Sequence, residues 1–143
     1  MILPPILELS LQGVFDSGVP NRERIILRPT EDVDLTQFGI MLGVRMDGGA
    51  VWPIRDQFFW FGNIRVAPPS WIVVVTRAGE FRTTNHPKTG HTIYWMFWGR
   101  NEVVFSDGKI VPVVFQIGSV LIGGHVTPPV PPPPPQTIPK TTR

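Results

Sequence analysis

Three histidines, His86, His91 and His125, are the side chains in this 143-residue sequence best suited to acid–base or metal chemistry. His86 and His91 flank a predicted loop tip, which Glu80 or Asp107 could in principle approach. A metal site needs three or four converging ligands, and this spacing matches no metal motif. Loop histidines exposed to water are the simpler interpretation. We therefore expect no catalytic, metal-binding or cofactor-binding residue, and an enzyme that uses His86 or His91 is only a third hypothesis.

The acidic segment Glu31-Asp32-Val33-Asp34 would place two carboxylates on one face of an extended chain. Such oxygens can bind Ca²⁺, but the twelve-residue acidic loop with its central glycine is absent. Arg22, Arg24 and Arg28 all stand at even-numbered positions, so an extended chain would place them on one face. We expect them to form ion pairs with these acids. A phosphate backbone held by the same arginine row is the weaker interpretation.

Several classes of catalytic and binding site lack their sequence signatures. The chain has no cysteine, which excludes a disulfide scaffold, a zinc–thiolate site, an iron–sulfur cluster and a thiol nucleophile. Gly-x-Ser-x-Gly, phosphate-binding glycine loops, His-Glu-x-x-His and dinucleotide fingerprints are also absent. These absences favour a protein that is not an enzyme.

Aromatic residues gather in two segments that would be apolar on both faces if extended. In the first, Phe58 and Trp60 oppose Phe59 and Phe61. In the second, Ile93, Trp95 and Phe97 oppose Tyr94, Met96 and Trp98. A strand that is apolar on both faces must be covered on both faces. The cover is either a segment of this chain, such as the N-terminal arm, or a partner subunit, with a stacking platform for sugars or bases as a third alternative.

Alternation with a period of two dominates the rest of the body and predicts strands. It is clearest over residues 38–46 and recurs over 7–11, 63–66 and 111–117, where Val111, Val113, Phe115 and Ile117 form the apolar face. Hairpin turns are expected at 47–49, 77–79 and 85–90. A further turn at 106–108 should join a strand at 103–105 to one at 109–114.

About nine or ten strands and no amphipathic helix predict an all-β fold. Tight turns favour antiparallel pairing. We expect an antiparallel β-sandwich, with a closed β-barrel as the alternative. Internal prolines at Pro53 and Pro112 favour the sandwich, because they suit edge strands or bulges.

Composition changes at residue 127, so we expect a β domain over 1–126 and an extended, proline-rich arm over 127–143. Eight of the last seventeen residues are proline, including Pro131, Pro132, Pro133, Pro134 and Pro135. Such a segment forms a polyproline II rod that can reach about 50 Å. It is either a solvated linker or a ligand for an aromatic groove, including one on a neighbouring copy.

Charge and hydropathy limit the expected partners. The arm holds two basic residues and no acid, so the formal charge of +2 belongs to the arm and the body is neutral. A neutral body argues against nucleic acid as a partner. No apolar run is long enough for a transmembrane helix, and the N-terminal segment does not resemble a secretion signal.

The leading functional hypothesis is a non-enzymatic structural protein that assembles with copies of itself and with other assembly proteins. A phage or viral virion component, such as a capsid-decoration, connector or tail protein, fits this description by analogy of architecture. The alternative is a monomeric binding module with an aromatic platform for carbohydrate. The interface candidates are Phe58, Phe59, Trp60, Phe61, Tyr94, Trp95, Trp98 and the prolines from Pro131 to Pro135.

Overall fold

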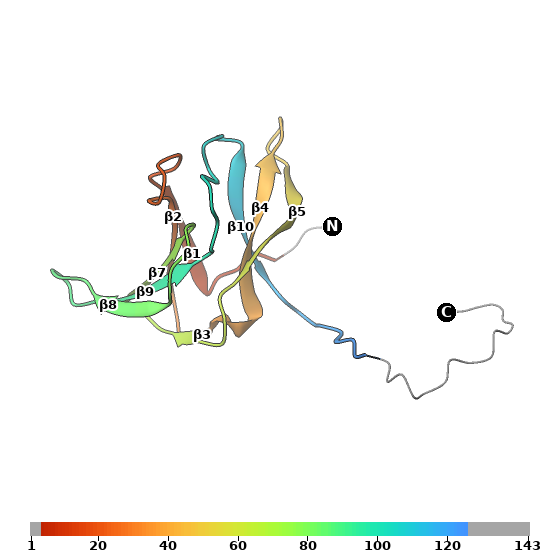
Figure 1. Ribbon diagram of the computed structural model, residues 1–143. Helices are drawn as coiled ribbons and strands as arrows, with labels where there is room; N and C mark the ends of the chain where they lie inside the picture. The colour runs from red at the N-terminus through yellow and green to blue at the C-terminus, as the bar shows by residue number, and fades with distance from the viewer. Residues whose placement is uncertain (1–3, 126–143) are drawn as a thin grey trace, which may run out of the picture.

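The computed structural model describes residues 4–125 (Figure 1). The predicted arm over 127–143, with Pro131 to Pro135, lies outside the described residues. The part that is described contains a single 3₁₀ turn, no α-helix, and no helix that could cross a membrane. Its elements are β1 (Leu9–Phe15), β2 (Arg24–Pro29), β3 (Val33–Asp34), η1 (Leu35–Gln37), β4 (Phe38–Arg45), β5 (Val51–Trp60), β6 (Arg65–Val66), β7 (Ser70–Val75), β8 (Arg82–Asn85), β9 (Thr92–Phe97) and β10 (Ile110–Gln116).

The strands form three sheets, which confirms the all-β prediction. A five-stranded sheet has the order β1-β2-β7-β9-β8, a three-stranded sheet has the order β10-β4-β5, and β3 pairs with β6. None of these sheets closes into a barrel, so the barrel alternative is wrong for the described residues. Antiparallel pairing was expected throughout, but β7 and β9 are parallel.

The parallel pair arises because β8 does not fold back beside β7. The chain leaves β7, crosses to the sheet edge as β8, and returns as β9 between them. The turn at 77–79 therefore changes the chain direction without forming the expected hairpin. The hairpin at 85–90 is confirmed, and a hydrogen bond from the His86 amide to the His91 carbonyl closes it at 2.8 Å. The hairpin at 47–49 between β4 and β5 is also confirmed.

One hydrophobic core joins the sheets. Ile25, Leu27, Ile72 and Val74 enter it from the five-stranded sheet, and Ile40 lies at the centre of the contribution from β4. Leu35 and Val66 close the core beside the small sheet. Figure 1 shows β10, β4 and β5 on one side of the molecule and β1, β2 and β7 on the other. The period of two in β4 is thus confirmed, since Phe38, Ile40 and Leu42 are all buried.

The predicted strand at 103–105 is wrong, and a buried carboxylate explains why. Glu23 is 1% exposed, and its carboxylate accepts hydrogen bonds from the amides of Val104 at 2.6 Å and Phe105 at 2.7 Å. It also accepts bonds from the Gly18 amide and the Thr76 hydroxyl. Because the Val104 and Phe105 amides bind a side chain, they are not free to form a strand ladder.

The predicted apolar face of β10 is also reversed. Ile110 and Val114 pack against the core, while Val111, Val113 and Phe115 point to the opposite side of the sheet. β10 is apolar on both faces, so its own pattern does not decide which face turns inward. The partner strand decides it, because Val114 lies opposite the core residue Ile40.

Candidate functional site

The charged residues expected to pair with one another have other partners. Asp16 contacts Arg24 at 2.6 Å and Arg22 at 3.6 Å, and Asp32 contacts Arg65 at 3.2 Å. The expected pairing of the 31–34 acids with Arg22, Arg24 and Arg28 is therefore wrong. β3 pairs with β6, whereas the arginines lie at or before β2 in another sheet.

Two carboxyl groups, those of Asp16 and Asp34, have a lowered pKa. The hydrogen bond from Arg24 is the main cause of a lowered pKa at Asp16, and the charges of Arg24 and Arg22 act in the same direction. Hydrogen bonds from the hydroxyl and amide of Thr36 lower the pKa of Asp34. The Asp34 carboxylate caps the 3₁₀ turn through these bonds with Thr36, so its role here is structural.

His86 and His91 flank the turn that joins β8 to β9. The Nδ1 atom of His86 accepts hydrogen bonds from the amides of Lys88 and Thr89, which shapes the turn. The Nδ1 atom of His91 is buried and has no hydrogen-bond partner within residues 4–125. Over the same residues, no group of three His, Asp or Glu side chains is placed to hold a metal ion. Within the described part of the chain neither histidine forms an ion pair with an acidic side chain.

The two aromatic strands divide their side chains as alternation predicts. On β5, Phe59 lies opposite the core residue Ile40, whereas Phe58 lies opposite Met41 on the outward side. The Phe59 ring lies 5.8 Å from the Phe61 ring and 5.6 Å from the Trp98 ring. The inward half of each strand thus packs within the domain.

The interface candidates consequently occupy three environments. Phe59, Phe61, Tyr94 and Trp98 belong to the core or pack against it. Trp95 points outward from the five-stranded sheet, opposite Val73. Phe58 and Trp60 point outward from the three-stranded sheet and are 50% and 47% exposed. Among the candidates within residues 4–125, only these last two share an open surface.

That open surface is the outward side of the three-stranded sheet, which we call the Phe58 face. Eight apolar side chains define it, and strand pairing places all of them on one side. Among the paired residues that point this way, Arg45 alone is charged. The eight residues are Met41, Val51, Pro53, Phe58, Trp60, Val111, Val113 and Phe115.

The middle strand makes the Phe58 face flat. Gly39 and Gly43 point outward from β4, and a Cβ atom at Gly39 would lie 2.9 Å from both the Phe58 and Phe115 rings. A Cβ atom at Gly43 would lie 3.2 Å from Val113. Side chains from β5 and β10 therefore close over β4 from both sides.

Hydrogen bonding fixes one edge of this face. The indole Nε1 of Trp60 donates to the Thr36 carbonyl at 2.9 Å, which orients the ring while half of it stays exposed. Sequence reasoning found Phe58 and Trp60 but missed Met41, Val113 and Phe115 as their neighbours. The sequence feature that could have indicated these neighbours is the pair Gly39 and Gly43, which lie on the same side of β4. Glycines inside a strand mark places where neighbouring side chains approach the backbone closely.

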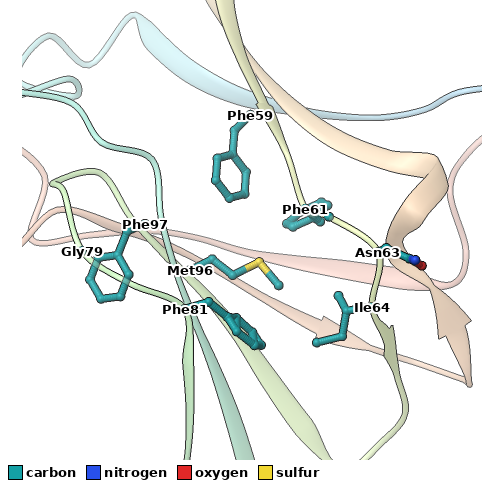
Figure 2. Close-up of a pocket in the computed structure, with 9 residues that line it drawn as sticks. Phe59, Phe61, Asn63, Ile64, Gly79, Phe81, Met96 and Phe97 are labelled. Atoms are coloured by element: carbon teal, nitrogen blue, oxygen red, sulfur yellow. The ribbon is translucent and has the colours of Figure 1, made fainter.

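An apolar pocket of about 360 Å³ opens at another part of the domain (Figure 2). Figure 2 shows the rings of Phe59, Phe61, Phe81 and Phe97 around it, together with Met96. Asn63 supplies the one polar side chain of the lining, and no titratable residue lines it. The pocket can hold an apolar group, but its lining supplies no acid, base or nucleophile.

The described domain thus presents a core-lined pocket and an outward apolar face, and the latter contains the two exposed aromatic candidates. The Phe58 face is the more extensive of the two sites, since it spans all three strands of its sheet. Comparison with protein-family models, curated proteins and solved structures found no match for this chain.

Proposed function

We propose that this chain is a non-enzymatic assembly protein, a β-sandwich subunit that associates with copies of itself through the Phe58 face. The observation that carries the proposal is an aromatic sheet face that no described segment covers. Phe58 and Trp60 remain about half exposed although they project from a regular sheet. A larger oligomeric assembly, such as a phage or viral virion, is the proposed setting.

The composition of the face supports an interface. Aromatic residues and methionine are enriched at the buried centres of interfaces, and charged residues are depleted there. The Phe58 face has this composition, with one arginine at its end. Monomeric proteins rarely leave a large contiguous apolar patch exposed to water. A second copy seated on this face would remove Phe58 and Trp60 from water.

The segment that follows β10 supports an arm that reaches beyond the domain, whereas the N-terminal segment does not. The described part of the N-terminal segment turns inward, where Ile6 packs against the core, so it does not provide a cover for Phe58. After β10 the chain continues without strand structure, and Val120, Leu121 and Ile122 are exposed by 67%, 102% and 90%. Consecutive apolar residues this exposed favour contact with another chain.

The alternative function is a monomeric module that binds carbohydrate on an aromatic platform. The observation that favours it is the Trp60 ring, which is anchored through Nε1 and half exposed. Planar rings held on a rigid sheet stack on apolar faces of sugars. A shift of tryptophan fluorescence on addition of glycans to a monomeric chain would support this module over assembly.

Light scattering after size exclusion tests the assembly proposal. The wild-type chain is expected to show a mass above that of the monomer, and Phe58→Ser with Trp60→Ser should return it to the monomer. Phe81→Ser is the matched control, because Phe81 is equally exposed but lies at the pocket. A chain that ends at His125 retains the face and should still associate. A monomeric wild type at all concentrations would contradict self-association.

A further inference from the structure

The outward side of the five-stranded sheet carries arginines stacked on aromatic rings, and we call it the arginine face. The Arg28 guanidinium lies 4.1 Å from the centre of the Trp71 ring. Arg82 lies 5.4 Å from Trp95. The same arrangement recurs at two further sites, Arg24 over Phe15 at 5.8 Å and Arg77 over Phe97 at 5.0 Å.

These pairs occupy one side of the sheet. Trp71 lies beside Ile93, and Val73 lies beside Trp95, in the register of β7 and β9. Arg82 of β8 lies opposite Trp95 and points the same way. The buried residues Ile72 and Val74 occupy the other side, toward the core. The arginine face therefore looks away from the core, as the Phe58 face does on the other large sheet.

Charge is strongly segregated onto this face. It holds four arginines, and among the described residues the one carboxylate in contact with them is Asp16, which is bound to Arg24. Within residues 4–125 no ion pair is formed by Arg28, Arg77 or Arg82. The described residues contain as many acidic as basic side chains, so the rest of the domain is net negative. A neutral total thus hides a cationic face.

The stacked arrangement determines which anion suits the face. A guanidinium that lies on a ring keeps its N–H donors at its edge, where they can bind phosphate oxygens. Its outer plane stays open for a nucleobase, and aromatic side chains offer the same kind of surface. Sulfated glycans would bind the positive charge of the guanidinium groups but carry no planar group that stacks on them. A nucleic acid strand carries both phosphates for the charge and planar bases for stacking.

We propose that the arginine face binds single-stranded nucleic acid, with phosphates on the guanidinium edges and bases stacked on the arginine and tryptophan planes. This inference is independent of the assembly proposal, because the two faces lie on different sheets. It reverses the expectation drawn from net charge, which averages over all faces of the domain.

Fluorescence anisotropy with a labelled oligo(dT) of about twenty nucleotides tests the proposal. Arg28→Ala with Arg82→Ala should weaken binding by about tenfold or more. Arg28→Lys keeps the charge but loses the planar stack, so it should weaken binding while leaving the salt dependence nearly unchanged. Arg55→Ala, an exposed arginine of β5 in the other sheet, is the control and should bind as the wild type does.

The salt dependence and a set of competitors distinguish the sources of affinity. Three to four phosphate contacts predict a slope of about −2 to −3 for the logarithm of the binding constant against that of salt concentration. Heparin and duplex DNA should compete more weakly than unlabelled oligo(dT). Absence of oligo(dT) binding at low salt, equal competition by heparin, or equal loss in Arg55→Ala would each overturn the proposal. Circular dichroism melting of every variant establishes that the domain is folded.

Discussion

The rings of Phe58 on β5 and Phe115 on β10 lie 5.2 Å apart, centre to centre, although β4 separates their strands. They meet above Gly39, whose missing side chain leaves the space that both rings occupy. The Phe58 face therefore depends on a residue that contributes no apolar surface of its own. The contact of these two rings above Gly39 joins β5, β4 and β10 on the outward side of the sheet.

Gly39→Ala is expected to destabilise the domain by about 2 kcal/mol, because it overpacks a closed site. The new Cβ atom would lie 2.8 Å from the Phe59 carbonyl oxygen, a backbone atom that cannot easily move. The change should also displace the two rings and weaken self-association. Gly118→Ala is the matched control, since nothing lies within 4 Å of that Cβ position. Denaturant unfolding measures the first effect and light scattering the second; equal behaviour of the two variants would contradict the expected packing.

Glu23→Ala is expected to lower the free energy of unfolding by about 3 kcal/mol, because it leaves buried amide donors without an acceptor. Val104 and Phe105 would lose the bonds that hold their loop against the domain. Glu23→Gln should also be destabilising, since its NH₂ group would face amide donors. Urea unfolding provides the comparison.

Glu80→Ala serves as the reference for Glu23, because Glu80 is an exposed acid in the β7–β8 loop. Its effect should stay within about 0.5 kcal/mol. If Glu23→Ala were as stable as Glu80→Ala, the buried carboxylate would not organise the 99–109 segment.

The all-β fold was predictable from turns and from the alternation of apolar and polar residues, because this alternation lies within the sequence of a single strand. β4 shows this best, since Phe38, Ile40 and Leu42 turn inward as expected. The parallel insertion of β9 was not predictable, because Asp-Gly and Gly-rich turns specify local reversal and not the neighbour of a strand. The loop at 103–105 was missed for a related reason: its amides bind Glu23, which is about eighty residues away.

Acid should weaken the contact between Asp16 and Arg24. The pKa of Asp16 is lower in the folded state than its ordinary value, chiefly through the hydrogen bond from Arg24. The ionised carboxylate therefore stabilises the fold above about pH 4, and this contribution is lost as pH falls through the lowered pKa. The difference in unfolding free energy between wild type and Asp16→Asn should narrow as pH decreases from about 5 to 2.

Asn is the suitable replacement at this position. Asp16 has a φ of 52°, and asparagine tolerates this left-handed conformation better than most residues. The variant thus removes the charge without adding backbone strain. A difference that stays constant across the whole pH range would show that the Asp16 charge does not contribute to stability.

The candidate surfaces were predictable only in part. Alternation correctly separated Phe58 and Trp60 from Phe59 and Phe61, because a strand fixes the parity of its own residues. It could not place Phe115 beside Phe58 or Arg82 beside Trp95, since these contacts depend on sheet order and register. Net charge could not reveal the arginine face for the same reason, because composition contains no information on which residues share a face.

Site-specific cross-linking tests the central claim, association through the Phe58 face, most directly. The cysteine-free chain permits a single engineered thiol. Val51→Cys places it on the Phe58 face, whereas Thr84→Cys places it on the outward side of the five-stranded sheet, opposite Ile93. With a short bismaleimide, Val51→Cys should yield covalent dimers that disappear when Phe58→Ser is added, and Thr84→Cys should remain monomeric. Dimers from Thr84→Cys alone, or equal yields from both positions, would contradict assembly through the Phe58 face.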